Sequence, residues 1–164
     1  MDWKVRLGPR TRPIIGLAWS GHPMHKNDHN RSISLRSLLP LLDIEATFVS
    51  LQKEVRVADT ELLKERADIL HFGDALGDFS DTAALISNLD LVISVDTSIA
   101  HLAGALAKPV WVLLPFVPDW RWLLDRKDSP WYPTARLFRQ DETRQWDNVI
   151  ARVHARLHDF VRGL

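Results

Sequence analysis

Short, uninterrupted apolar runs constrain the fold of this chain more than any other feature. The clearest are PIIGLAW at residues 13–19, ATFVSL at 46–51, LDLVISV at 89–95 and VWVLL at 110–114. Apolar runs of this length without polar alternation are typical of strands that a parallel sheet buries on both faces. Two shorter apolar runs, at 69–72 and 135–138, predict further strands.

Helical patterns separate these runs. We predict helices over residues 34–42, 60–68, 81–88, 99–107 and 146–162, the first of them capped by Ser34. Apolar residues recur at helical spacing in the last of these segments, which indicates packing against the core and no catalytic or binding role. Since each parallel pair of strands needs a crossover, the alternation predicts an α/β fold with a doubly wound parallel sheet.

The composition is that of a folded domain. With 164 residues, of which 46% are hydrophobic, the chain is long enough for one domain or for one half of a two-domain enzyme. We expect residues 1–12 to be a lead-in and residues 13–164 to form a single domain, because no internal repeat or low-complexity linker divides them.

Charge and cysteine content exclude several classes of function. The 21 basic residues balance the 21 acidic ones, so no overall field favours nucleic acid or an anionic membrane as a partner. There are no cysteines, which excludes thiol catalysis, thiolate metal sites and disulfides. We expect a cytoplasmic location, because no apolar run reaches the ~18 residues of a membrane span and the first residues lack the core of a signal peptide.

The strand expected at 89–95 leads directly into a helix with a polar start. In open parallel sheets, ligands bind beyond the carboxyl ends of the strands. The start of this helix therefore predicts an anion site, formed by the first-turn amides of Thr97, Ser98 and Ile99 and by the hydroxyls of Thr97 and Ser98. His101 lies one turn deeper on the same face. Asp96 would repel a bare phosphate, so a ligand with both phosphate and sugar hydroxyls fits better. The alternative is that Asp96 or Thr97 only caps the helix and that His101 is a core histidine.

The loop after the first expected strand, SGHPMHKNDHNRS at residues 20–32, should open on the same edge of the sheet. One hypothesis is a phosphate clamp in which Lys26 and Arg31 neutralise the anion at Thr97 and Ser98. A second is a metal site formed by the three histidines of the loop, and a third is a solvated surface loop.

Three segments together resemble a known family. They are residues 94–115, the segment DWRWLLDRKDSPWYPTARLFRQ behind them and the segment GLAWSGHPMHKNDHNRS in front of them. The chain, from about Ile14 to the last expected helix, resembles the C-terminal half of family 9 glycosyltransferases, the heptosyltransferase-like group. It looks most similar to the branch found at the C-termini of bacterial tetratricopeptide-repeat proteins. The run V-D-T-x-x-A-H-L-A is the most specific motif.

The resemblance implies a GT-B architecture, in which two Rossmann-like halves face one another and the C-terminal half holds a nucleotide-diphosphate sugar. It implies that Asp96, Thr97 and Ser98 contact the diphosphate and the sugar, that His101 supports them and that Lys26 faces the phosphates. Residues placed near the nucleoside by position are Gln52, Phe72, Gly73 and Asp74. Many relatives carry glycine where Ser98 stands, and this departure bears on how closely a phosphate approaches the backbone.

The family also implies an inverting reaction without a metal or other cofactor, because cationic side chains and a helix N-terminus stabilise the leaving diphosphate. Its members take the catalytic base from the N-terminal half. We therefore expect this chain to bind donor without transferring sugar, its partners being a nucleotide sugar and an N-terminal half or tetratricopeptide repeats in a longer protein.

A Trp-rich segment follows the strand expected at 110–114. Trp120 and Trp122, with Trp131 and Tyr132, either stack on a base or sugar or pack the loop onto the edge of the sheet. Asp119 and Arg121 are close enough in sequence to pair with each other.

The alternative function is a degenerate GT-B half that serves as a binding or protein-interaction module. An oxidoreductase is disfavoured because no G-x-G-x-x-G lies between a strand and a helix, and no nucleophile motif supports a hydrolase.

Overall fold

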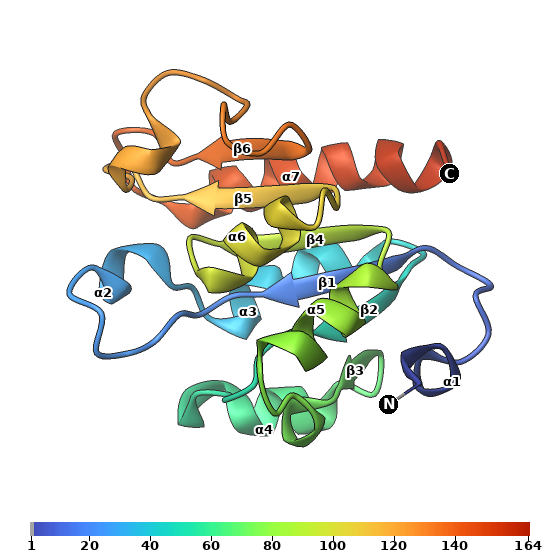
Figure 1. The fold of residues 1–164 in the computed structure, drawn as a ribbon. Helices are drawn as coiled ribbons and strands as arrows, with labels where there is room; N and C mark the ends of the chain where they lie inside the picture. Colours follow the sequence, from blue (N-terminus) through green and yellow to red (C-terminus); the bar gives the residue numbers. More distant parts are fainter. Residues whose placement is uncertain (1) are drawn as a thin grey trace.

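The computed structural model describes residues 2–164, which form one six-stranded sheet with helices on both faces (Figure 1). Its strands are β1 (Ile14–Ala18), β2 (Thr47–Ser50), β3 (Ile69–His71), β4 (Leu91–Val95), β5 (Val110–Leu114) and β6 (Ala135–Arg139). The α-helices are α1 (Trp3–Leu7), α2 (Asp28–Arg31), α3 (Leu35–Leu38), α4 (Val57–Glu65), α5 (Phe79–Ser87), α6 (Ser98–Ala105) and α7 (Trp146–Arg162). Three 3-10 turns are η1 (Leu39–Asp43), η2 (Gly73–Ala75) and η3 (Trp120–Trp122). Within the described range, no helix is both long and apolar enough to cross a membrane.

The sheet has the order β3-β2-β1-β4-β5-β6, and every neighbouring pair is parallel. The chain runs outward from β1 through β2 to β3 and then returns to lay β4 on the other side of β1. At the carboxyl ends of β1 and β4 the chain thus leaves the sheet in opposite directions, which is where ligands bind in folds of this kind. The arrowheads of β1, β5 and β6 in Figure 1 point toward the α2 end of the molecule. This Rossmann-like, doubly wound fold confirms the predicted fold class.

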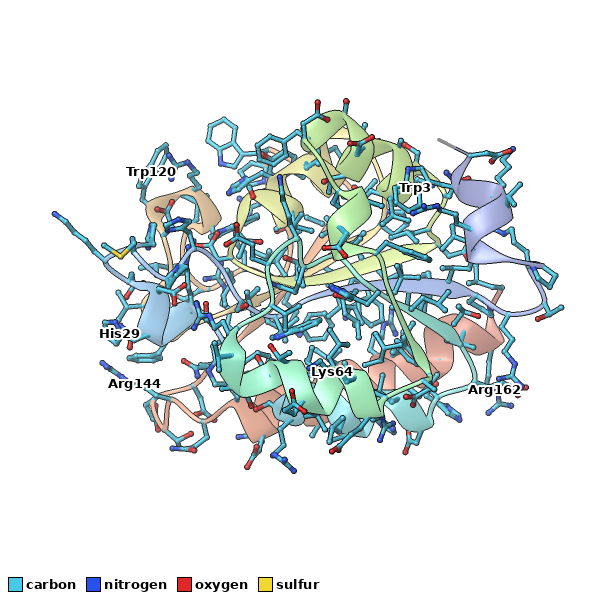
Figure 2. The ribbon with its side chains drawn as sticks, turned by 90° about the horizontal axis from the view of Figure 1, so that it is seen from below. Trp3, His29, Lys64, Trp120, Arg144 and Arg162 are labelled. Carbon is cyan, nitrogen blue, oxygen red and sulfur yellow. The ribbon has the colours of Figure 1, made fainter. Side chains whose placement is uncertain are left out.

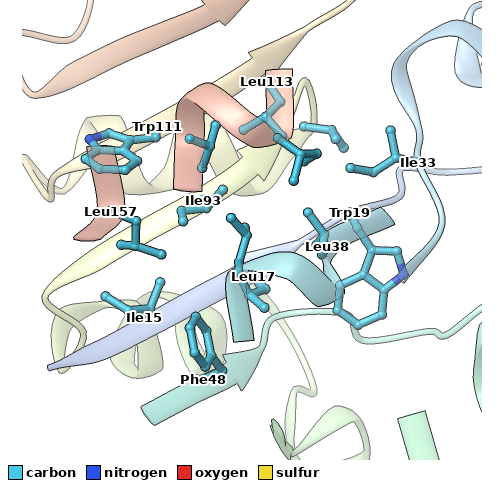
Figure 3. Close-up of a cluster of buried hydrophobic side chains, with 14 of the residues drawn as sticks. Ile15, Leu17, Trp19, Ile33, Leu38, Phe48, Ile93, Trp111, Leu113 and Leu157 are labelled. Carbon is cyan, nitrogen blue, oxygen red and sulfur yellow. The ribbon is translucent and has the colours of Figure 1, made fainter. Parts of the chain in front are cut away.

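Each face of the sheet is covered by its own helices. On one face, the side chains of β1, β4 and β5 pack against α3 and α7, and Trp19, Phe48 and Leu157 belong to this core (Figure 3). On the other face α1, α5 and α6 pack, with Trp3 and Trp122 in the core. All five residues of β1, of β4 and of β5 are buried, because helices cover them from both sides.

The predicted strands and the last helix are confirmed, but several helices differ from the prediction. The segment 34–42 starts at the Ser34 cap, yet it is α-helical only to Leu38 and continues as a 3-10 turn, since Pro40 lacks the amide that an α-helix requires. Helix α4 lies three residues earlier than predicted, at Val57–Glu65. The expected lead-in contains α1, whose Trp3 and Leu7 are buried in the core, so part of it packs on the sheet.

Candidate functional site

The N-terminus of α6 directly follows the buried strand β4. Thr97 is the N-cap, and its Oγ1 accepts a hydrogen bond from the amide of Ile99 at 3.3 Å and lies 3.3 Å from Oγ of Ser94. The capping interpretation therefore holds for Thr97, and the amide of Ile99 is already used. Ser98 is exposed, and as the first helical residue its amide precedes the helix's own hydrogen bonds. Of the three first-turn amides that predicted the anion site, the cap thus occupies that of Ile99, and the amides of Thr97 and Ser98 remain.

His101 lies one turn into α6 and has partners on both ring nitrogens. Its Nδ1 is 2.9 Å from the hydroxyl of Tyr132, and its Nε2 is 3.8 Å from Oδ1 of Asp96. The ring stacks on Trp122 with a centroid distance of 5.1 Å. Burial lowers the pKa of His101, against the opposing effect of Asp96. The imidazole is therefore harder to protonate than a free histidine, and its hydrogen-bond contact in this site is the one with Tyr132.

A cleft of about 900 Å³ opens at the carboxyl ends of the strands. Its walls come from the loop after β1, the start of α6, and the loops after β5 and β6. The members that matter for an anionic ligand are the first-turn residues Asp96, Thr97 and Ser98, together with His101 and three arginines, Arg31, Arg121 and Arg144. His29, Trp120 and Arg144 lie at this end of the molecule in Figure 2.

Arg31 reaches the cleft as predicted and is held there by other protein groups. Its Nη1 donates to the backbone oxygen of Asp96 at 2.7 Å, and its Nε is 3.5 Å from Oδ1 of Asp28. Asp28 is buried and accepts hydrogen bonds from Ser32 and Arg56. Burial alone would raise the pKa of Asp28, but these hydrogen bonds and the two guanidinium groups hold the pKa below its usual value. The carboxylate therefore stays ionised and fixes Arg31 between β1 and β4.

Lys26 and His22 are exposed and do not line the cleft, although His25 and His29 do. His22 and His25 instead accept, through Nδ1, the backbone amides of residues two positions later. Within the part of the chain that the structure describes, no three histidine, aspartate or glutamate side chains are grouped to hold a metal ion. The structure thus brings His25 and His29, but not His22, to the cleft.

The residues placed near the nucleoside do not line the cleft. Gln52 is buried, where its Oε1 accepts the amides of Trp19 and Ser20 at 3.0 and 3.1 Å and its Nε2 donates to Oγ of Ser20 at 3.0 Å. It thus links the ends of β1 and β2. Phe72 packs edge-on against Trp3 at 5.5 Å, and Gly73 is buried beside His71. Asp74 is exposed next to the edge strand β3.

The Trp-rich segment divides between packing and exposure. Trp122 is fully buried, and Tyr132 lies so close to Gly104 that a Cβ there would be 2.5 Å from Tyr132 Cγ. Trp120 and Trp131 remain more than half exposed, and they border a second hollow of about 420 Å³ that shares His101, Arg121 and Tyr132 with the cleft. Trp122 and Tyr132 therefore pack against the domain, whereas Trp120 and Trp131 are available to a ligand. Asp119 and Arg121 pair at 2.9 Å, as the sequence suggested.

Sequence reasoning missed the contribution of the last strand. Gln140, Arg144 and Trp146 follow β6 and line the cleft, as does Phe116 after β5. Their position directly after predicted strands was the available signal, because the carboxyl ends of all parallel strands meet at one edge.

Comparison with known proteins supports a relation to glycosyltransferases. Residues 60–114, which include the start of α6 but not Arg31 or Arg144, match the family described as glycosyltransferase family 9 (heptosyltransferase). The chain is 30% identical over 167 residues to Protein FlbA from Caulobacter vibrioides, and the match covers 96% of this chain and 27% of FlbA.

A solved structure shows the same fold. It is the E. coli ADP-heptose lps heptosyltransferase II, with a TM-score of 0.58 and 19% identity over 94% of this chain and 48% of that chain. The chain therefore spans about a quarter of FlbA and about half of the heptosyltransferase.

Proposed function

We propose that this chain is the donor-binding half of a GT-B glycosyltransferase, which holds a nucleotide-diphosphate sugar in the cleft at the start of α6. The observation that carries the proposal is the meeting of Ser98, Arg31 and Asp96 at the carboxyl ends of β1 and β4. The matches to glycosyltransferase family 9 and to a heptosyltransferase structure give additional support.

The chemistry of the cleft suits a ligand that carries both phosphates and hydroxyls. The amide and hydroxyl of Ser98 and the positive end of the α6 dipole favour a phosphate, and Arg31 adds a cation. Asp96 is buried, but its side chain keeps 13% exposure and lines the cleft beside His101, where it accepts hydrogen bonds from sugar hydroxyls. A ring attached to the diphosphate reaches the hollow bordered by Trp120 and Trp131.

The proposed reaction is an inverting transfer. An acceptor hydroxyl loses its proton to a base outside this chain, and its oxygen forms a bond to the anomeric carbon. The bond between that carbon and the diphosphate oxygen breaks, and the electron pair leaves with the diphosphate. The α6 N-terminus and the arginines stabilise the added negative charge, so the step as proposed requires no metal.

Transfer in this proposal needs an acceptor-binding part that a longer protein supplies, either an N-terminal GT-B half or tetratricopeptide repeats. This part of the proposal is supported by the length of the relatives, since the chain spans only about a quarter of FlbA and about half of the heptosyltransferase. With this arrangement, the isolated chain binds donor in the cytoplasm without turning it over.

The test is calorimetric titration with ADP, GDP, UDP and TDP, with AMP and adenosine as controls, before and after EDTA. We expect saturable binding of one diphosphate, at about micromolar to millimolar Kd, unaffected by EDTA. The variant Asp96→Asn should weaken the matching nucleotide sugar more than the free diphosphate, because only the sugar presents hydroxyls to this carboxylate. Failure of all four diphosphates to bind would contradict the proposal.

A second candidate function is a protein-interaction module, and one observation favours it. The loop after β5 exposes large apolar side chains beside the cleft, namely Phe116, Val117, Trp120, Leu123, Leu124 and Trp131. Such a patch is typical of surfaces that bind another protein. This function predicts self-association in sedimentation experiments that Trp120→Ser abolishes, together with no affinity for nucleotides.

A further inference from the structure

The three arginines of the cleft differ in the charge that faces them. Arg31 is 3.5 Å from the buried carboxylate of Asp28, and Arg121 pairs with Asp119 at 2.9 Å. Arg144 has no carboxylate within 4.0 Å anywhere in residues 2–164. Two acids share its turn: Asp141 is engaged by Thr143 and Asn148, and Glu142 is exposed and does not pair with Arg144 in the described structure. Arg144 is therefore the cleft arginine whose charge is left for a ligand.

Arg144 is held in place although its loop is on the surface. Its amide donates to the carbonyl of Asp141 at 3.0 Å, and its own carbonyl accepts from Nε2 of Gln140 at 2.9 Å. Gln140 is buried and also accepts the amide of Phe116 at 3.0 Å, which joins the loops after β5 and β6. The guanidinium group of Arg144 lies 5.5 Å from the ring centroid of Phe116.

The backbone of Arg144 is in a conformation that favours glycine. Its φ is +55°, in the left-handed region where a Cβ is disfavoured. A long cationic residue at such a position is kept at a cost in stability, and local strain of this kind concentrates at ligand-binding sites. No ion pair accounts for arginine here, since within residues 2–164 the exposed side chain faces no acid and its guanidinium group lies only near the ring of Phe116.

We propose that Arg144 is a phosphate-binding residue of this cleft and supplies the cation that the sequence assigned to Lys26. The inference rests on the proposed function, since its ligand is the diphosphate of the donor. The planar guanidinium group binds two phosphate oxygens at once, whereas Lys26 is exposed outside the cleft. The diphosphate thus lies between the start of α6 on the β4 side and Arg144 on the β6 side.

The test measures the affinity of the 164-residue chain for inorganic pyrophosphate and for the nucleoside diphosphates. Arg144→Ala should weaken pyrophosphate binding about tenfold or more, because a charge-assisted bidentate contact is lost. Arg144→Lys should give an intermediate loss, since the charge remains without the fork. The matched control Lys26→Ala removes a neighbouring charge outside the cleft and should change the affinity less than about twofold.

Arg144→Gly separates a binding role from a structural one. Glycine accepts a φ of +55°, so this variant should keep or raise the Tm and lose pyrophosphate affinity as the alanine variant does. If the wild-type chain binds diphosphates and Arg144→Ala binds them equally well, this inference is wrong and the proposed function stands. If the wild-type chain binds neither pyrophosphate nor any nucleoside diphosphate, both are wrong.

Discussion

Replacement of Asp28 by asparagine tests the network that presents Arg31 to the cleft. Asp28 is 5% exposed and faces both Arg31 and Arg56, with a hydrogen bond from Ser32 at 2.7 Å. Asparagine keeps the size of the side chain but removes its charge. The side chain of Arg31, only 12% exposed, then has no counter-ion, and its Nε already lacks a hydrogen bond.

The expected loss of folding stability in Asp28→Asn follows from the burial of the ion pair. Removal of one partner from a buried ion pair costs about 3–5 kcal/mol. Arg56 is 34% exposed and regains solvent, so we expect a loss near the lower end, about 3 kcal/mol. For a domain of this size, each kcal/mol lowers the Tm by about 2–4 °C, so the variant should melt about 6–12 °C below the wild type. Glu61→Gln, which breaks the exposed pair with Lys64, is the control and should change the Tm by less than about 2 °C.

Thermal unfolding followed by circular dichroism measures both variants. Because the pKa of Asp28 is lowered in the folded chain, its ionic stabilisation is present above its usual pKa and is lost as the pH falls through the lowered value. The Tm difference between the wild type and Asp28→Asn should therefore narrow in acid. A difference of under about 2 °C at pH 7, or one that is unchanged at the lowest pH where both chains stay folded, would refute the reasoning.

Three further predictions concern α6. Burial lowers the pKa of His101, so the unfolded chain takes up the proton first as the pH falls. The stability of the fold should therefore decrease as the pH drops from the usual histidine pKa to the lowered one. His101→Gln should remove this part of the pH dependence, and NMR titration of the imidazole checks the direction of the pKa shift. Gly104→Ala should cost about 1 kcal/mol, since overpacking against Tyr132 exceeds the gain in helix propensity, whereas Gly163→Ala, with no contact under 3.6 Å, should cost nothing measurable by denaturant titration. Thr97→Val should lose about 1 kcal/mol of stability with the cap, and Thr97→Ser should keep it.

The fold could be predicted because its strongest signals are local. The strands β1, β4 and β5 are buried on both faces and therefore read as continuous apolar runs, and the strong amphipathic pattern of α7 gave its bounds correctly. Helix α1 was missed because only Trp3, Val5 and Leu7 are apolar in a five-residue helix that is stabilised by packing on the sheet. Short helices of this kind carry too few residues for a periodic pattern.

The candidate site could be predicted only where one segment forms it. The start of α6 contains its own cap and follows its own strand, so the positions of Asp96, Thr97 and Ser98 could be inferred from the sequence. The choice between Lys26 and Arg31 could not, because it depends on Asp28, which binds the guanidinium group of Arg31 and leaves Lys26 in solvent. Gln52 likewise gave no signal that its amide links two strand ends.

The place of Arg144 in the cleft could not be predicted from the sequence, because it depends on the order of the strands. Arg144 is 47 residues from Thr97, and only the order β4-β5-β6 places the loop after the last strand at the same edge as the start of α6. The carbonyl of Arg144 accepts a hydrogen bond from Gln140, which in turn accepts the amide of Phe116 in another loop. An anion in this cleft would therefore be bound from two sides of the sheet, and its affinity would depend on how rigidly β5 and β6 hold their loops as well as on α6. Gln140→Leu removes this link without removing the charge of Arg144, and it should accordingly weaken pyrophosphate binding in the same titration. When Gln140→Leu is added to Arg144→Ala, the affinity should stay almost the same as in Arg144→Ala alone.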